Sequence, residues 1–377
     1  MTFAMPGGAS RNAGPILYGP EITAVADALL AGHYGHGPLT ERFERDLARF
    51  LDVPDVVAVA TGTAAMHLAL LEAGIGPGDE VIVPSLTFCS TIQAIVATGA
   101  DPVFIDVDNN NLCVRPDDVL AAITPATRAV LPVLYSGRAV DLTGIQHHLD
   151  ARGILTIEDA AQAFGSDLNG RLVGANPHVV TCFSFGPMKN LTCGEGGAIV
   201  PRTPQQAQTL RRMRTVGIAQ TLAQRADSTT YDVIGFGIRA HLQSLNAAIG
   251  SAQLAHFTHA RTIRQQLWRH YTQALAGVPG AEMTDVDIDH TVPFNCVIQV
   301  PDRDQVLRRM RAAGVGVGVH YPPNHLQPAF ARWTTDLPVT EDIGRRILSL
   351  PFHPSLRPED VNLVVAALHD ALSSRNP

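Results

Sequence analysis

Lys189 is the only lysine in the chain, because the other 27 of its 28 basic residues are arginines. An amine can lose its proton and attack a carbonyl carbon, whereas a guanidinium stays protonated in proteins. A chain that otherwise uses arginine therefore points to Lys189 as a position where arginine cannot serve. A solvated surface lysine is the simpler alternative, and the surrounding residues must decide between the two.

A candidate phosphate cradle lies at Thr61–Ala65, between a predicted strand ending at Ala60 and an apolar predicted helix. The backbone N–H groups of Gly62, Thr63 and Ala64 would meet a hydroxyl and the positive end of the helix dipole there, and such groups bind phosphate. A threonine at a helix start is also an ordinary N-cap, so this motif alone is not specific.

Two further polar groups follow predicted strands. Asp159 follows the apolar run ILTI (154–157) in the stretch Glu158-Asp159, and a carboxylate there could pair with a protonated ring nitrogen, although helix capping is the ordinary alternative. Ser184 precedes Lys189 in the stretch FSFGPMKNLTCGEGG, where a hydroxyl could reach a phosphate and the glycines allow close backbone approach.

Pyridoxal 5′-phosphate (PLP) requires this combination of groups: a lysine for a Schiff base, a carboxylate for the pyridinium nitrogen, and phosphate donors. Phe88, which follows the run PSLT, is placed to stack on the cofactor ring, although phenylalanine is more often a core residue. The sequence therefore predicts a PLP site with Lys189 and Asp159 as its catalytic residues.

The elements that position these residues form a regular series. Short apolar runs start near residues 56, 80, 102, 128, 154 and 179, and predicted helices lie between them, including 64–74, 88–98 and 140–149. This pattern is typical of an α/β fold with a mainly parallel sheet flanked by helices. Ligands of such sheets bind beyond the carboxyl ends of the strands.

We expect three parts in the chain: an irregular N-terminal arm (1–20), a large PLP-binding α/β domain (21–241) and a smaller C-terminal α+β domain (242–377). The first helices of the large domain are predicted at 21–31 and 40–51. The C-terminal part is predicted to contain one long helix over 242–276, strands over 294–300 and 315–320, and helices over 303–313 and 358–373.

Composition excludes several classes of protein. The chain is 46% apolar with a net charge of −7, which argues against disorder and against a nucleic-acid partner. No apolar run approaches the roughly 20 residues that a membrane span needs. Five scattered cysteines without CxxC spacing indicate neither a disulfide framework nor a zinc site. We expect a cytoplasmic protein that binds no membrane.

Three other motifs do not indicate a second kind of site. Residues 235–240 fit GxGxxA, but no acidic residue occurs between Asp232 and Glu282 to bind a dinucleotide ribose. The acidic turn 106–111 lacks the glycine and glutamate of a calcium loop. His320 and His325 lack an evident third ligand, so no metal is expected.

Taken together, these motifs resemble the DegT/StrS-type sugar aminotransferases, which have the fold type I of aspartate aminotransferase. The resemblance spans nearly the whole chain, through GPLTERFERDLARFL, TGTAAMHLAL, PSLTFCSTIQAI, EDAAQAFGS, FSFGPMKNLTCGEGG, LNAAIGSAQL, GVHYPPNHLQPAF and LSLPFHPSL. It implies a homodimer with shared active sites, in which Lys189 forms the Schiff base and Asp159 binds the ring nitrogen.

The same resemblance implies roles for other residues. Phe88 would cover the ring, Gln162 would lie near the ring hydroxyl, and Gly62, Thr63, Ala64, Ser184 and Arg239 would complete the cofactor site. The substrate is expected on the loops that carry Tyr34, His320, Tyr321 and His325.

The chain departs from the family pattern in three places. It has GFGIR at 235–239 where Gly-Tyr-Asn-Tyr-Arg is usual, so Gly237 replaces an asparagine that reaches the partner's cofactor phosphate; we expect Gly237→Asn to tighten PLP binding weakly. It has LYSG at 134–137 where His-Leu-Tyr-Gly is common. It keeps Lys189 where dehydratases of the family have histidine, which favours transamination.

The leading interpretation is a PLP-dependent aminotransferase that moves an amino group from glutamate or glutamine to a keto-sugar, expected to be nucleotide-linked. A cyclitol ketone is the chief alternative acceptor. An NAD-linked oxidoreductase is a weaker alternative because the ribose-binding acid is missing. A non-catalytic regulatory homologue is weaker still, because Lys189, Asp159 and Ser184 are all retained.

Overall fold

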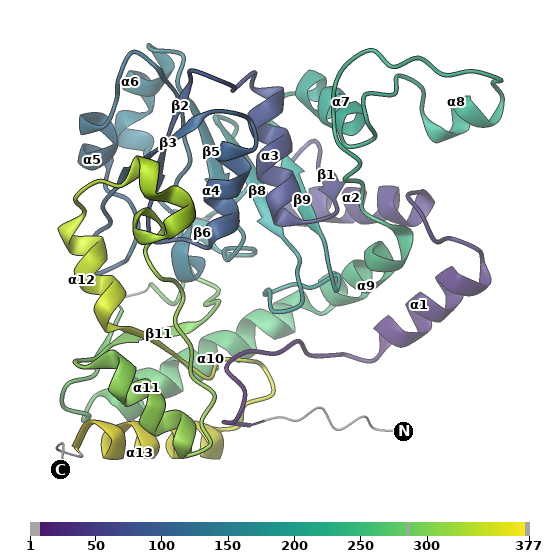
Figure 1. The fold of residues 1–377 in the computed structure, drawn as a ribbon. Helices are drawn as coiled ribbons and strands as arrows, with labels where there is room; N and C mark the ends of the chain where they lie inside the picture. Colours follow the sequence, from purple (N-terminus) through teal and green to yellow (C-terminus); the bar gives the residue numbers. More distant parts are fainter. Residues whose placement is uncertain (1–7, 285–286, 374–377) are drawn as a thin grey trace.

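A seven-stranded sheet forms the centre of the molecule in this computed structural model, which describes residues 8–284 and 287–373 (Figure 1). Its strand order is β1-β9-β8-β5-β4-β2-β3. The strands are β1 (Val57–Val59), β2 (Glu80–Pro84), β3 (Asp101–Ile105), β4 (Thr127–Val130), β5 (Leu155–Asp159), β8 (Val179–Ser184) and β9 (Gly197–Val200).

The sheet is mainly parallel, as the sequence predicts. Strand β9 is the exception: it pairs antiparallel with both β8 and β1. The sequence pattern did not reveal β9, because the strand follows β8 after a short Gly-rich loop instead of a crossover helix. Both ends of the loop that carries Lys189 are therefore fixed to adjacent strands.

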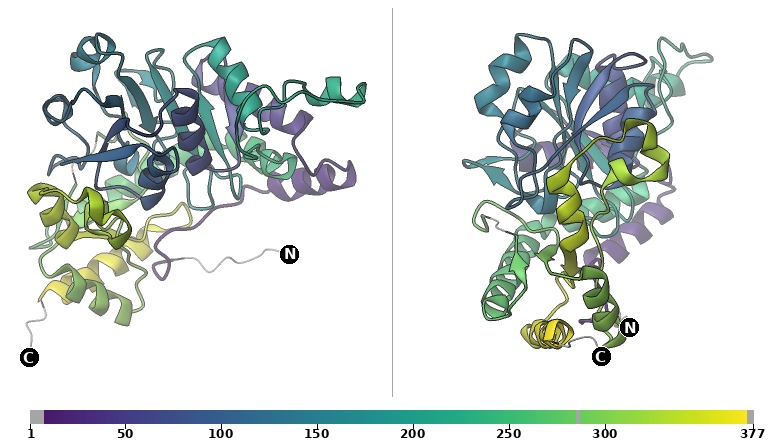
Figure 2. Two further views of the ribbon diagram at one scale, coloured as in Figure 1. Left: turned by 45° about the horizontal axis from the view of Figure 1, so that its top comes forward. Right: turned by 60° about the vertical axis from the view of Figure 1, so that its left-hand side comes forward.

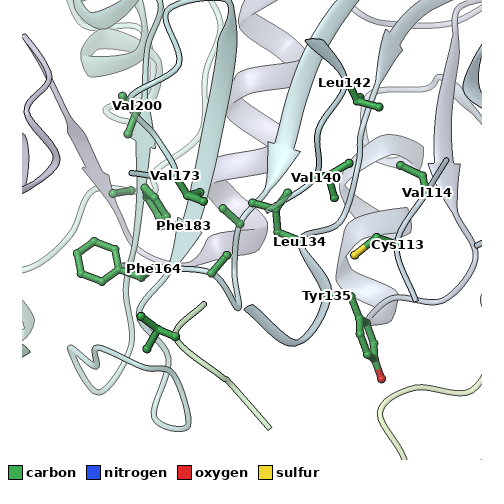
Figure 3. Packing of buried hydrophobic residues seen from close by; sticks show 14 of the residues in the cluster. Cys113, Val114, Leu134, Tyr135, Val140, Leu142, Phe164, Val173, Phe183 and Val200 are labelled. Carbon is green, nitrogen blue, oxygen red and sulfur yellow. The ribbon is translucent and has the colours of Figure 1, made fainter. Parts of the chain in front are cut away.

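Helices cover both faces of the sheet. Helices α3 (Gly62–Glu72), α4 (Cys89–Val96) and α7 (Pro204–Met213) bury their apolar side chains in one core cluster. Helix α2 (Pro38–Leu51) and residues of α9 (Ser244–Ala255) join a second cluster. Figure 3 shows part of that second cluster, from which the ring of Tyr135 extends with its hydroxyl at the far end.

A smaller antiparallel sheet lies in the C-terminal part of the chain, in the order β10-β11-β12. Its strands are β10 (Glu282–Met283), β11 (Cys296–Gln299) and β12 (Ile347–Leu350). A third core cluster joins this sheet to α10 (Phe257–Leu275), α11 (Arg303–Ala312) and α13 (Pro358–Ser373). The fold class expected from the sequence is therefore confirmed, whereas the expected domain boundaries stay a prediction.

The remaining elements are short or lie at the edges of the fold. They are α1 (Pro20–Leu30), α5 (Pro116–Ala121), α6 (Gln146–Asp150), α8 (Leu222–Ala226), α12 (Pro338–Arg346) and the hairpin β6 (Asp167–Leu168) and β7 (Arg171–Leu172). Short 3-10 turns occur at Tyr135–Gly137, Thr143–Ile145, Asn324–Leu326 and Pro328–Trp333. Across the described ranges, no helix is both long and apolar enough to cross a membrane.

The expected single helix over 242–276 is wrong, because the structure has two helices that meet at His256. His256 has φ −106° and ψ 5°, outside the helical region. The break turns Phe257 into the second core cluster, where its ring packs edge-on against Phe164 at 4.9 Å. This long-range packing is not visible in the helical periodicity.

The expected strand over 315–320 is also wrong, apart from one bridge between Gly318 and Ser349. The N-terminal segment supplies the reason. The backbone N–H of Gly316 donates to Ala9, and the Asn12 side-chain amide donates to the carbonyls of Gly316 and Ser349 at 3.3 and 2.8 Å. Residues 8–12 thus bind where a strand partner would lie. Residues 1–7 of the predicted arm lie outside the described part of the chain.

Candidate active site

Asp159 lies at the carboxyl end of β5, beside the end of the parallel strand β8. One carboxylate oxygen accepts a hydrogen bond from the Thr91 hydroxyl at 2.7 Å, and the other accepts from the Ala161 backbone at 3.0 Å. Burial raises the pKa of Asp159, while these two hydrogen bonds and the charge of Lys189 oppose that rise. The carboxylate is therefore buried, both of its oxygens accept hydrogen bonds, and the charge of Lys189 acts on it.

Lys189 lies in the loop between β8 and β9, and its Nζ atom is 4.8 Å from the centre of the Phe294 ring. Burial lowers the pKa of Lys189, and the carboxylates of Asp159 and Glu195 act in the opposite direction. A lowered pKa increases the neutral amine fraction, which is the nucleophilic form. Lys189 and Asp159 thus lie close enough for each charge to affect the pKa of the other group.

The predicted phosphate cradle forms where the N-terminus of α3 meets the ends of β8 and β9. The Thr61 side chain caps α3 by accepting a hydrogen bond from the Ala64 N–H at 3.0 Å. A Cβ on Gly62 would lie 2.6 Å from the Ser184 Cβ, so only glycine lets the helix end approach Ser184 this closely. The first N–H groups of a helix have no partner within it, and here they lie beside a serine hydroxyl.

Gln162 and Phe88 are the two residues expected to contact the cofactor ring. The Gln162 Oε1 atom accepts a hydrogen bond from the Ser136 N–H at 2.7 Å, which leaves the Nε2 group as the side chain's donor. Phe88, at the start of α4, is 52% exposed, so it is not a core residue. Its ring lies 5.5 Å from that of Tyr321.

Two of the four expected substrate residues lie close to this cluster. Burial and the charge of Lys189 lower the pKa of His320, which keeps its ring neutral at physiological pH. Burial and the charge of Asp159 raise the pKa of Tyr321, so its hydroxyl stays protonated. The backbone of this segment is held by the Tyr135 hydroxyl, which donates to the His320 carbonyl.

The other expected contacts are not brought together within one chain. His325 has no exposed surface, and its Nδ1 atom lies 2.6 Å from the Ser85 hydroxyl. That buried position does not support a substrate contact, because the ring packs inside the fold. Tyr34 and Arg239 are exposed on segments away from Asp159, and Tyr34 bonds only weakly to Leu29 at 3.4 Å.

The structure contradicts the expectation that Gly237→Asn would tighten PLP binding. A Cβ on Gly237 would lie 2.1 Å from the backbone oxygen of Met213. That oxygen also accepts the Ile238 N–H at 2.9 Å, so it is fixed in place. An asparagine would displace this backbone. Gly237 is therefore required by close packing, even though its φ is not positive.

Three contributors escaped the sequence analysis. Thr91 donates to Asp159, Phe294 faces the Lys189 amine, and Glu195 adds a carboxylate beside the Lys189 loop. Thr91 lies one helical turn after Phe88, a spacing that could have identified it. The position of Phe294 depends on the Ser136 carbonyl, which accepts its N–H at 3.1 Å, and no local pattern signals that contact.

These residues fit PLP. The set combines a buried carboxylate, an amine with a lowered pKa, a hydroxyl beside a helix N-terminus and the side-chain amide of Gln162, whose oxygen is already occupied. Within residues 8–284 and 287–373, no group of three or more histidine, cysteine, aspartate or glutamate residues could hold a metal ion.

Comparison with known proteins agrees with this geometry. Residues 16–369 match the DegT/DnrJ/EryC1/StrS aminotransferase family. DesV from S. venezuelae is 35% identical, with a TM-score of 0.88 and coverage of 94% of this chain and 95% of its own. The sugar aminotransferase CalS13 from Micromonospora echinospora is 30% identical, with a TM-score of 0.88 and coverage of 95% and 98%.

The structure of a third relative is that of its PLP form. The PLP form of Spr1654 from Streptococcus pneumoniae, a sugar aminotransferase by its description, is 25% identical, with a TM-score of 0.88 and coverage of 95% and 97%. The match spans both sheets and every residue of the candidate site. The chain therefore belongs to the DegT/DnrJ/EryC1/StrS family of PLP-dependent aminotransferases.

Proposed function

We propose that this aminotransferase transfers an amino group from glutamate or glutamine to the ketone of a nucleotide-linked sugar. The observation that carries the proposal is the arrangement around Lys189: its amine and the Asp159 carboxylate affect each other's pKa, and Gly186 lies near both Lys189 and Ser184, the residue that packs on the helix N-terminus at Gly62. The similarity to CalS13 and Spr1654, both described as sugar aminotransferases, supports a sugar as the acceptor.

Asp159 and Lys189 would have different roles in the reaction. When bound, PLP supplies an electron sink for the carbanion that forms at the donor carbon. Asp159 would keep the ring nitrogen protonated, and the hydrogen bonds from Thr91 and Ala161 fix the orientation of its carboxylate. Lys189 would hold the cofactor through its side-chain amine, and the free amine would serve as the acid and base that moves a proton during the transfer.

The other site residues bind and orient. The Ser184 hydroxyl and the backbone N–H groups of Gly62 and Thr63 would hold the phosphate. The expected contact from the Ala64 N–H is not available, because that group donates to the Thr61 side chain. The Gln162 amide would donate to the ring hydroxyl, because its oxygen already accepts from the Ser136 N–H. The aromatic pair of Phe88 and Tyr321 would cover one side of the ring.

Substrate recognition falls to the segment around His320. The neutral ring of His320 and the protonated hydroxyl of Tyr321 donate and accept hydrogen bonds without attracting ions, which suits the hydroxyl groups of a sugar. We propose that Tyr34 and Arg239 act on the site of a second copy, because both are exposed in the single chain. The five free cysteines are consistent with a cytoplasmic enzyme.

The projecting segment 216–239 supports a homodimer with shared sites. It leaves the body of the fold on the side of α7 and α8 in every view (Figures 1 and 2). The side chains of Tyr231, Val233, Ile234 and Phe236 on this segment are 59%, 60%, 61% and 97% exposed. Apolar groups that gather on a surface in this way mark an interface.

A screen of acceptors tests the proposed reaction directly. Keto-sugar nucleotides and ketocyclitols would be assayed with glutamate and with glutamine, following amino-acid consumption and the amino product. We expect the highest kcat/KM for a keto-sugar nucleotide. A clear preference for a ketocyclitol would replace the sugar acceptor with the cyclitol, and turnover of neither class would contradict the proposal.

Lys189→Arg keeps the positive charge but removes the amine that can lose its proton. We expect kcat to fall by at least about 10³-fold, as far as in Lys189→Ala. Arg269→Lys is the control. It exchanges the same two residue types at a half-exposed position on α10, and it should keep normal turnover. Borohydride reduction of the wild-type holoenzyme should attach the cofactor to the Lys189 peptide alone. Robust turnover by Lys189→Arg would refute its role.

Asp159→Asn should still bind PLP but should turn over at least about 100-fold more slowly, because an amide does not stabilise a protonated ring nitrogen. Glu158→Gln is the matched control. Glu158 is the preceding carboxyl on β5, and it bonds instead to the Thr181 hydroxyl at 2.8 Å. Absorbance spectra would report the bound cofactor in both variants. Equal rates in the two would reduce Asp159 to a structural role.

Phe236→Asp should weaken dimerisation at least about tenfold, because it places a charge where an apolar ring would be buried in both copies. Leu363→Asp is the control, since Leu363 is 63% exposed on α13, far from the projecting segment in sequence. Sedimentation velocity across a concentration series measures the effect. An unchanged dimer, or a wild-type protein that is monomeric at all concentrations, would contradict the shared-site arrangement.

A further inference from the structure

A cavity of about 260 Å³ lies beside β5, apart from the candidate active site. Thr156 and Glu158 on this strand line the cavity, whereas Ile157 and Asp159 do not. Successive residues of a strand point to opposite faces of a sheet, so the cavity and the Asp159 carboxylate lie on opposite faces. Cavities of about 150 Å³ already accept a molecule the size of benzene, so this one has room for a small ligand.

The cavity is open to solvent at one end. Its inner wall consists of buried apolar side chains, three of them labelled in Figure 3, namely Val140, Leu142, Val173 and Val179. Exposed residues form its mouth: Thr143 and, on the hairpin of β6 and β7, Asn169 and Arg171. None of the described residues that line it belongs to the projecting segment 216–239. The dimer contact proposed above therefore leaves this cavity free.

The carboxyl group of Glu158 has an oxygen without a partner. Its Oε2 atom accepts a hydrogen bond from the Thr181 hydroxyl at 2.8 Å. Among the described residues, no group donates to its Oε1 atom and no cation forms an ion pair with it. Burial raises the pKa of Glu158 to about 7, so the group is partly ionised at neutral pH. A cation bound beside it would stabilise the ionised form.

Thr156 supplies a second polar group without a partner. It precedes Glu158 by two residues on the same face of β5, and it is only 2% exposed. Its hydroxyl is buried and has no hydrogen bond in the described structure. Buried polar groups nearly always have a partner, so an unpartnered hydroxyl beside a cavity indicates a missing one. Two oxygen acceptors on one wall thus lack a donor.

The remaining lining limits what the donor can be. Arg171 is the one cation among the described residues that line the cavity, and its place at the exposed mouth disfavours a ligand with a second positive charge. An anion would meet the charge of Glu158. An inorganic cation would face hydrocarbon over much of its surface, which is unfavourable for a strongly hydrated ion. An organic cation with an apolar body suits both walls.

We propose that this cavity binds a small organic monocation, an ammonium ion with a short aliphatic body. The ammonium group would pair with the Glu158 carboxylate and donate to the Thr156 hydroxyl, because charge-assisted hydrogen bonds are the strong ones. The aliphatic body would pack against the inner wall of Val140 and Val173. The proposed transamination does not use this cavity, so the inference goes beyond that reaction.

The test is a ligand-observed NMR titration of the PLP-loaded enzyme with N-methylpyrrolidinium. This tertiary ammonium ion cannot form a Schiff base, so it does not react with the cofactor. We expect saturable binding with roughly millimolar affinity, in keeping with its few heavy atoms. Tetrahydrofuran, a neutral ring of similar size, should bind at least about tenfold more weakly, because it carries neither the charge nor the N–H donor.

Each other outcome of this titration would count against the proposal. Absence of saturable binding would mean that the cavity holds water only, and would overturn it. Equal affinity for tetrahydrofuran would overturn the cationic class of the ligand. Competition by potassium chloride at the same concentration as N-methylpyrrolidinium would overturn the organic class.

Variants assign the binding to this cavity. Glu158→Gln keeps the shape of the side chain but removes its charge, and it should weaken N-methylpyrrolidinium binding at least about tenfold. Thr156→Val should weaken it about threefold, the usual effect of one lost neutral hydrogen bond. Glu359→Gln is the control, since it makes the same exchange at an exposed position on α13. Unaltered binding in Glu158→Gln, or an equal loss in Glu359→Gln, would contradict the site. Thermal unfolding curves would verify that each variant is folded.

A pH series gives a readout that altered packing alone would not produce. The affinity for N-methylpyrrolidinium should fall as the pH drops below about 7, because Glu158 then becomes protonated. The other titratable groups nearby keep their state: Arg171 stays charged, and burial raises the pKa of the Cys182 thiol on β8 well above its usual range. Glu158→Gln should lose this pH dependence, and a variant that retained it would refute the role of Glu158.

Discussion

The site depends on how closely the N-terminus of α3 approaches the ends of β8 and β9. Two glycines permit this approach: a Cβ on Gly62 would collide with Ser184, and a Cβ on Gly197 would lie 2.6 Å from the Thr61 carbonyl oxygen. A larger residue at either position would separate the helix from the sheet. The helix dipole, the Thr61 cap and the Ser184 hydroxyl act at one point because this contact is so close.

Much of the chemistry could be predicted from the sequence because it follows strand ends. Asp159 and Ser184 come directly after apolar runs, and parallel strands bring their carboxyl ends to one edge of a sheet. Lys189 stood out by residue type alone. The final helix over 358–373 has the predicted bounds, since a proline and two acidic residues mark its start. Signals of this kind are local in sequence, so they do not depend on contacts with distant segments.

The remaining features depend on contacts between distant segments. The break at His256 follows from the packing of Phe257 against Phe164, and the missing strand near Gly316 follows from Asn12 taking its hydrogen bonds. The burial of His325 follows from its bond to Ser85. In each of these three pairs, the two residues are far apart in the sequence. Residue type and periodicity were therefore a better guide to the chemical groups of the site than to the exposure of individual residues.

The reversed direction of β9 has a consequence for how the loop of Lys189 behaves. Its ends are tied together where the Phe185 N–H donates to Gly196 at 2.8 Å and the Cys193 N–H donates to Phe185 at 2.9 Å. The Asn190 amide anchors its middle to the Val292 carbonyl at 3.0 Å. Hydrogen bonds thus hold the backbone of the loop at both ends and in the middle, and the four-carbon side chain of Lys189 keeps its rotational freedom. In the reaction proposed above, the Lys189 amine would therefore move to and from the cofactor by changes of side-chain rotamer.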